Sequence, residues 1–177
     1  MIGKNAFLSY FFVEFGEVMS KFPENTQFRT SADFSKRLLL IMDDHDCPSN
    51  RQFAELVGVS VPVISNAVNF NILPSLRSLI KIADRLEISI KYLLGIDDRS
   101  DFIPAASPSS FYARLEALTR ERNLNYGQLA SKMDFPRTYL YEWIKESTLP
   151  SVDYILELSE FFNVTPDYLL GRTDYKN

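Results

Sequence analysis

The residue types best suited to hold a metal ion gather in one short run, Asp43-Asp44-His45-Asp46-Cys47. Carboxylate, imidazole and thiolate groups all bind metals in proteins. The run lies where a long helix is expected to end in a loop, however, and a charged loop of this kind is usually solvated. We therefore interpret it as a loop and expect no metal site.

Residues and motifs that commonly carry out catalysis are also scarce in this sequence. His45 and Cys47 are the only histidine and the only cysteine among 177 residues. A lone cysteine cannot form an intrachain disulfide and fits a reducing cytoplasm, and a lone histidine removes multi-histidine metal sites. The chain also has no glycine-rich phosphate loop and no Gly-x-Ser-x-Gly turn. We expect no enzyme activity and no cofactor.

The charge balance limits how the chain can bind nucleic acid. It has 19 Lys and Arg against 23 Asp and Glu, a net charge of -4. Residues 34–98 hold seven basic and eight acidic residues, and residues 109–177 hold eight and ten. Neither region has the broad positive field that attracts DNA without sequence preference. Any binding to nucleic acid must come from a local patch.

An internal repeat organises most of the chain. Aligned at an offset of 76 residues, positions 52–98 and 128–174 are identical at 10 of 47 sites. The identical pairs are Gln52/Gln128, Ala54/Ala130, Leu73/Leu149, Pro74/Pro150, Ser75/Ser151, Tyr92/Tyr168, Leu93/Leu169, Leu94/Leu170, Gly95/Gly171 and Asp98/Asp174. Upstream the offset becomes 77, which pairs Phe34, Arg37 and Leu38 with Phe111, Arg114 and Leu115. Such a period is typical of a duplicated structural unit.

The repeat predicts four parts: an N-terminal arm (1–33), a first domain (34–98), a linker (99–110) and a second domain (111–177). The linker reads RSDFIPAASPSS, and its two prolines and four serines are typical of a connecting segment. Fully extended, it reaches at most roughly 40 Å. Each domain has about 65 residues, which is enough for a small helical unit.

Each domain is predicted to form about five short helices. Apolar residues recur at three- and four-residue spacings, and no alternating strand pattern competes, so the fold class is all-α. The expected N-caps are Ser49, Ser75, Asn125, Ser151 and Thr165, and the expected stops are Gly95 and Gly171. Ser49 and Asn125 each precede a glutamine by three residues, the pattern of a capping box.

Two segments carry a resemblance to a known family. QLASKMDFPRTYLYEWIKESTLPSVDYILELSEFFNVTPDYLLG resembles the Cro/repressor-type (XRE-like) helix-turn-helix family, and QFAELVGVSVPVISNAVNFNILPSLRSLIKIADRLEISIKYLLG is similar. Ala54 and Ala130 take the small-residue position of the second helix, and Gly58 is the turn glycine. Asp134 replaces that glycine in the second domain and tolerates a left-handed backbone better than most residues. The resemblance implies two tandem five-helix, lambda-repressor-like domains.

The resemblance also implies which residues contact DNA. The third helix of such a domain enters the major groove and reads base edges. By motif position, the base-reading residues are Arg137, Thr138, Tyr141 and Glu142 on a recognition helix at 137–145, and the phosphate-binding residues are Tyr126, Gln128 and Lys145. Arg137 is the strongest candidate because a guanidinium can bond O6 and N7 of guanine at the same time. The competing interpretation is that Arg137, Glu142 and Lys145 are ordinary solvated surface charges. Tyr139 and Trp143 are expected to pack in the core or at its rim instead of stacking on bases.

The first domain offers weaker candidates, namely Gln52, Val61, Asn66 and Asn69. Its third helix, SVPVISNAVNF (60–70), contains no Lys, Arg or Gln. Asn66 can pair with adenine, but Val61 stands where a polar residue is expected. This domain is therefore either a second reader or a helper that dimerises or contacts a partner, because fold alone does not fix function.

The N-terminal arm predicts an amphipathic helix. One side of it carries Phe7, Leu8, Phe11, Phe12, Phe15, Val18 and Met19. This face either packs on the chain's own domains or forms a homodimer contact. Insertion into a membrane surface is disfavoured because the polar face carries Glu14 and Glu17 instead of basic residues.

These patterns predict a cytoplasmic, sequence-specific transcriptional regulator that binds double-stranded DNA through the helix at 137–145. We expect a homodimer, formed through the N-terminal helix or the first domain, and no membrane association. The alternative is a protein-interaction or dimerisation module that keeps the helix-turn-helix fold without contacting DNA.

Overall fold

The computed structural model describes residues 30–146 and 148–177, and these residues form ten helices and no strand. The all-α prediction is confirmed. The helices are α2 (Thr30–Asp44), α3 (Asn50–Val57), α4 (Val61–Phe70), α5 (Leu76–Leu86), α6 (Ile90–Leu93), α7 (Phe111–Glu121), α8 (Tyr126–Ala130), α9 (Arg137–Glu146), α10 (Val152–Phe162) and α11 (Pro166–Leu169). The predicted amphipathic helix of the arm falls in residues 1–29, outside the described residues.

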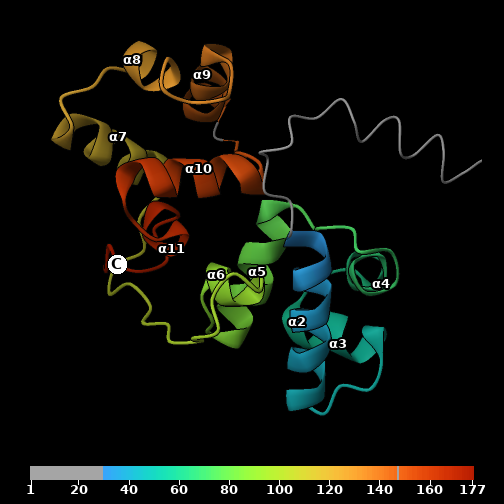
Figure 1. Ribbon diagram of the computed structural model, residues 1–177. Coiled ribbons are helices and arrows are strands. Elements are labelled where there is room, and N and C mark those ends of the chain that lie inside the picture. Colours follow the sequence, from blue (N-terminus) through green and yellow to red (C-terminus); the bar gives the residue numbers. More distant parts are fainter. Residues whose placement is uncertain (1–29, 147) are drawn as a thin grey trace, which may run out of the picture.

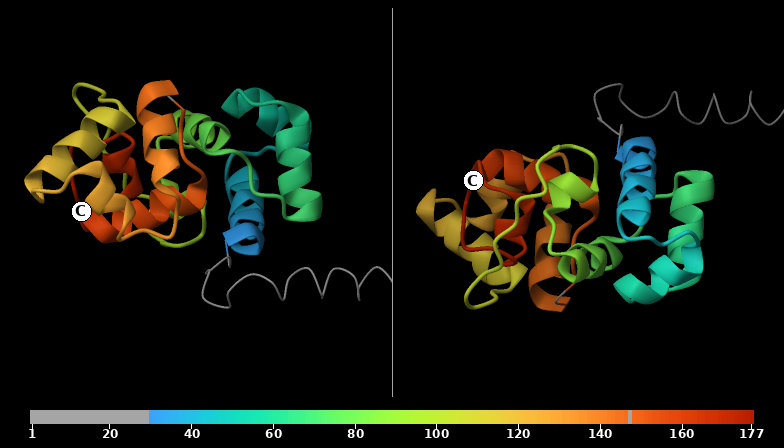
Figure 2. Two further views of the ribbon diagram at one scale, coloured as in Figure 1. Left: turned by 90° about the horizontal axis from the view of Figure 1, so that it is seen from above. Right: turned by 90° about the horizontal axis from the view of Figure 1, so that it is seen from below.

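The helices follow one another in two similar series, which we name the first set (α2 to α6) and the second set (α7 to α11). α4 and α9 have ten residues each, α5 and α10 have eleven, and α6 and α11 have four. Figure 1 shows the first set in blue to green and the second in yellow to red. The views in Figure 2 show the two sets side by side.

The helix ends follow the predicted capping pattern. Ser49, Ser75, Asn125 and Thr165 each accept a hydrogen bond from a backbone N–H of the first turn. Ser151 occupies the N-cap position without a side-chain hydrogen bond. Gly95 and Gly171 both have a φ of +73°, a left-handed conformation that favours glycine.

The turn between the second and third helices differs in the two sets, and here the prediction for Asp134 is wrong. Gly58 ends α3 with a φ of +70°. Asp134 is not among the residues with positive φ. Instead, α8 ends early at Ala130, and Ser131 keeps a right-handed conformation. Without glycine at the turn, the chain avoids the left-handed state and lengthens the connection to α9.

One side-chain arrangement occurs in both sets. The guanidinium of Arg37 lies 4.3 Å from the ring centroid of Tyr92 and donates a 2.6 Å hydrogen bond to Asp98. Arg114 makes the same contacts with Tyr168, at 4.3 Å, and with Asp174, at 2.6 Å. Each arginine joins the first helix of its set to the segment around the fifth helix. The same arginine contacts therefore link the first and fifth helices in both sets.

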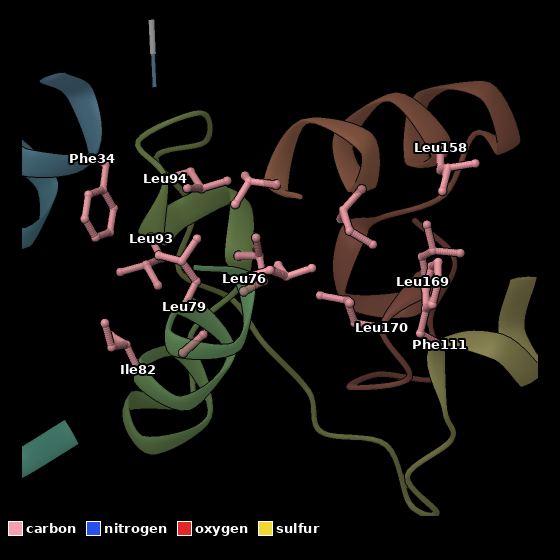
Figure 3. Close-up of a cluster of buried hydrophobic side chains, with 14 of the residues drawn as sticks. Phe34, Leu76, Leu79, Ile82, Leu93, Leu94, Phe111, Leu158, Leu169 and Leu170 are labelled. Carbon is pink, nitrogen blue, oxygen red and sulfur yellow. The ribbon is translucent and has the colours of Figure 1, made fainter. Parts of the chain in front are cut away.

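Buried apolar side chains of the two sets form one cluster. Figure 3 shows it running from Phe34 in α2 to Leu158 in α10, with Leu94 and Leu170 between them. All four are at most 8% exposed. Burial of apolar surface on this scale is the main term that stabilises such a fold. The sets share a core instead of folding around two separate ones.

Residues 99–110 connect the sets, but they do not act as a free tether. Ala105 donates from its backbone N–H to the carbonyl of Arg172 (2.8 Å), and Ser109 donates to the carbonyl of Gly171 (3.3 Å). The ring of Phe102 lies 4.4 Å from the Arg172 guanidinium. These backbone and aromatic contacts attach the connecting segment to the second set.

Candidate nucleic-acid interface

The exposed side of α9 carries every residue that we predicted to read bases. Arg137, Thr138, Tyr141 and Glu142 are all exposed, whereas Leu140 and Trp143 on the other side of the helix are buried. Positions 137, 138, 141, 142 and 145 recur at helical spacing, so they form one stripe along the helix. Lys145 is exposed near the end of this stripe. The packing of α9 thus leaves its polar stripe open to a ligand.

Arg137 and Tyr141 are joined along this stripe. Nη2 of Arg137 donates to the Tyr141 hydroxyl at 2.6 Å, and the guanidinium carbon lies 5.3 Å from the centroid of the Tyr141 ring. A guanidinium has five N–H donors in a planar fork. The bond to Tyr141 uses one of them and restrains the side chain, so the remaining donors stay available to a bidentate acceptor.

Arg137 also lies against the start of α8. A Cβ atom placed on Gly127 would lie 3.5 Å from the guanidinium carbon of Arg137 and 3.7 Å from its Nε. Both distances are ordinary van der Waals contacts, so Arg137 lies against the first turn of α8 without requiring a glycine there. The start of α9 and the start of α8 are therefore neighbours. Sequence analysis did not predict this contact between Arg137 and Gly127.

The first turn of α8 is closed by a capping box. Asn125 Oδ1 accepts from the backbone N–H of Gln128 at 2.9 Å, and Gln128 Oε1 accepts from the backbone N–H of Asn125 at 2.9 Å. The two side chains therefore satisfy the backbone N–H groups of Asn125 and Gln128. The side-chain NH₂ group of Gln128 is the donor suited to a phosphate oxygen.

Tyr126 is half-buried beside this turn. Burial raises the pKa of its hydroxyl, and the nearby carboxylate of Glu116 acts in the same direction. The hydroxyl therefore stays protonated at neutral pH and keeps a proton to donate. It remains a candidate phosphate contact.

An aromatic cluster holds α9 in place. Phe135, in the turn before α9, packs edge-on against Trp143 and Tyr154, with ring centroids 5.0 and 5.1 Å apart. Tyr139 lies 5.8 Å from Tyr154. Such pairs stabilise beyond their buried area. The packing role predicted for Tyr139 and Trp143 agrees with these contacts.

The same turn is anchored to α10 by a charged side chain. The backbone N–H of Asp134 donates to Glu157 Oε1 at 2.6 Å. Burial raises the pKa of Glu157, and this hydrogen bond opposes the shift. Glu157 fixes the path of the chain into α9, a role that the sequence did not reveal.

The corresponding helix of the first set presents a different surface. Val61 is 39% exposed, and Asn66 and Asn69 are exposed. No Lys or Arg lies on α4. The Oε1 atom of Gln52 accepts a 2.9 Å hydrogen bond from the Ser49 hydroxyl. The structure thus brings the weaker candidates to the surface without adding a cation to them.

Apolar side chains are also exposed around the first set. Leu39, Leu40, Phe70 and Ile72 are 48%, 59%, 68% and 53% exposed. Large exposed apolar side chains favour contact with another macromolecular surface. Two of them, Leu39 and Leu40, lie on α2, and the other two flank the end of α4.

The metal interpretation of residues 43–47 gains no support. His45 Nδ1 lies 2.9 Å from the Ile41 carbonyl, and Asp46 has a φ of +51° in the loop after α2. Within residues 30–146 and 148–177, no group of three or more His, Cys, Asp or Glu side chains is placed to hold a metal ion. This part of the chain also has no helix long and apolar enough to cross a bilayer.

Comparison with known families finds a match, and it falls in the second set. Residues 115–169, from within α7 to the end of α11, match the family model described as helix-turn-helix. This segment is therefore similar to helix-turn-helix proteins. It contains the α8–α9 pair and all seven DNA contacts predicted for the second set. No curated protein and no solved structure matches the chain.

Proposed function

We propose that the chain is a DNA-binding transcriptional regulator that inserts α9 into the major groove of double-stranded DNA. One observation carries the proposal. Within the helix-turn-helix segment, Arg137 is exposed at the start of α9, lies against α8 and is joined to Tyr141. Base-reading helices contact bases mainly through their N-terminal residues.

The proposed roles follow from the chemistry of each side chain. Arg137 bonds O6 and N7 of guanine, Thr138 contacts a base or a thymine methyl group, and Glu142 accepts from a cytosine amine. Gln128, Tyr126 and Lys145 hold the phosphate backbone. Because the chain is acidic, few cations contribute, and we expect binding to weaken strongly with added salt.

A second function is supported by the first set alone. Its exposed apolar residues and the lack of cations on α4 favour a protein contact. The expected homodimer, formed through this set or the N-terminal helix, belongs with this proposal. In this alternative the chain is an interaction module and does not bind DNA.

The test is retention of labelled genomic fragments by the full chain at low and moderate salt, followed by sequencing. We expect sequence-selective retention that falls as salt rises and is lost in Arg137→Ala. Arg99→Ala is the matched control, because Arg99 is exposed and bonds only to the neighbouring Asp97. Absence of retention at low salt, or equal losses in both variants, overturns the proposal. A protein recovered with the chain in the absence of DNA binding supports the interaction module.

A further inference from the structure

The two sets meet through the same helix of each. α6 and α11 are the fifth helices of their sets, and they contact each other. When two similar units touch through equivalent surfaces, a rotation close to two-fold relates them, as in a symmetric dimer. Here a single chain supplies both units. Figure 1 shows α9 above this contact and α4 to its right.

A buried ionic cluster secures the contact. Both carboxylate oxygens of Asp167 accept from the backbone N–H of Ile90, at 3.0 and 3.2 Å. Arg172 pairs with Asp167, donates to Asp84 at 2.7 Å and donates to the carbonyl of Ile88 at 3.0 Å. The side chains of Asp167 and Arg172 are 4% and 5% exposed. A cluster of buried, mutually paired charges tolerates little change in the relative position of the sets.

The contact can form only between unlike sets. Asp167 needs an N–H donor at the start of the facing helix, and Ile90 supplies it. The equivalent residue of the second set is Pro166, which has no N–H. The residue equivalent to Asp167 in the first set is Lys91, which has donors and no acceptor. Neither set can therefore make this bond with a second copy of itself.

The connecting segment keeps the two sets together. Residues 99–110 are bonded to the second set at Ala105, Ala106 and Ser109. A short covalent connection makes pairing within one chain far more favourable than pairing between chains.

We propose that the two sets pair with each other within one chain, so that a single chain presents α4 and α9 to two half-sites of one duplex. This inference rests on the proposed function. Paired recognition helices contact half-sites about one helical turn apart, roughly 34 Å. The two half-sites differ. Arg137 favours guanine in one, whereas Val61 and Asn66 favour a thymine methyl group and adenine in the other. The site is therefore asymmetric.

The first test measures half-sites per chain on a fragment retained in the experiment above. Hydroxyl-radical footprinting and light scattering of the same complex give the protected patches and the number of chains. We expect two patches about one helical turn, roughly 10 base pairs, apart with one chain bound. A single patch per chain, or two patches that need two chains, overturns this inference and leaves the proposed function standing. Failure to retain any duplex overturns both.

The second test disturbs the contact between the sets. Asp84 is 55% exposed and bonds to Arg172, so Asp84→Ala removes one partner without opening the core. We expect the affinity measured at the half-site that α4 protects to fall about tenfold or more relative to the affinity at the half-site that α9 protects. The reason is that the two helices are no longer held in register. Arg172→Ile, which introduces the residue found at the equivalent position 96, has a larger effect in the same direction. An intact α9 patch shows that the second set remains folded.

Glu121→Ala is the matched control for the second test. Glu121 is 53% exposed and pairs with Lys176 inside the second set. We expect this variant to leave the ratio of the two patches unchanged. If Asp84→Ala and Arg172→Ile also leave the ratio unchanged, the proposed pairing is wrong.

Discussion

Arg137 donates a 2.6 Å hydrogen bond to the hydroxyl of Tyr141, one turn further along α9. Both residues belong to the stripe that we propose reads DNA. The bond restrains a long side chain before any ligand arrives, which lowers the entropy that binding must remove. Under the proposed function, Tyr141 acts on recognition through Arg137 as well as through its own exposed surface.

Tyr141→Phe tests this arrangement. The variant keeps the ring beside the guanidinium and removes only the hydrogen bond, whose net contribution is about 0.5–1.5 kcal/mol. We expect DNA affinity to fall by a few-fold, less than in Arg137→Ala, as measured by fluorescence anisotropy on a selected fragment. Tyr175→Phe, at another exposed tyrosine, should leave affinity unchanged. Tighter binding by Tyr141→Phe would show that the hydroxyl competes with the base for Arg137.

Gly127→Ala should separate stability from binding. A Cβ atom at this position would lie 3.2 Å from Asn125 Oδ1 and 3.5 Å from the guanidinium carbon of Arg137. Alanine is favoured over glycine in a helix by about 0.5–1 kcal/mol, so we expect the stability in urea to stay equal or rise. Because the added Cβ meets Arg137 only at ordinary van der Waals distance, we expect DNA affinity to stay unchanged. Equal losses of affinity and stability would point to general misfolding instead.

The capping box on α8 gives a third prediction. Asn125→Ala removes the acceptor of the Gln128 N–H, which costs about 0.5–2 kcal/mol of unfolding free energy. Ser49→Ala removes a longer bond of 3.3 Å in the first set and should cost less. Urea unfolding monitored by circular dichroism measures both. A larger loss for Ser49→Ala would contradict the relative importance of the two caps.

The capping residues, the all-α fold and the exposed stripe on α9 could be predicted from the sequence because each depends on nearby residues. A cap needs a polar side chain within three positions, and a stripe needs only helical spacing. Arg137 and Lys145 are therefore on the surface, as predicted.

Other features depend on residues far apart in the chain, and the sequence did not reveal them. Asp167 bonds to Ile90, 77 positions away, and Arg172 bonds to Asp84, 88 positions away. The turn at Asp134 was misjudged for a related reason, because its anchor, Glu157, lies on another helix.

Glu157→Gln tests that anchor through pH. Burial raises the pKa of Glu157 above 4.5 in the folded chain, so the folded state favours the protonated form more than the unfolded state does. Its stabilising contribution is full below the unfolded pKa and is lost as pH rises through the folded pKa. Glutamine keeps an acceptor for the Asp134 N–H without titrating. We expect the stability of the parent chain relative to Glu157→Gln to fall as the pH rises through the raised pKa of Glu157.

Equilibrium urea unfolding at several pH values measures this difference. A stability difference that does not vary with pH would show that Glu157 titrates normally, and a difference that rises with pH would give the pKa shift the opposite sign.

Gly171 gives the last prediction. Its φ of +73° disfavours any side chain, and a Cβ atom there would overlap the backbone carbonyl of Ser109. Gly58 has a similar φ of +70°, with nothing within 4 Å of an added Cβ. Gly58→Ala should therefore cost about 1–2 kcal/mol from backbone strain alone. Gly171→Ala should cost clearly more, because residues 109–110 must also move away from the second set. Thermal unfolding of the two variants measures the difference. Equal losses of unfolding free energy would show that the segment before α7 moves aside without further destabilising the fold.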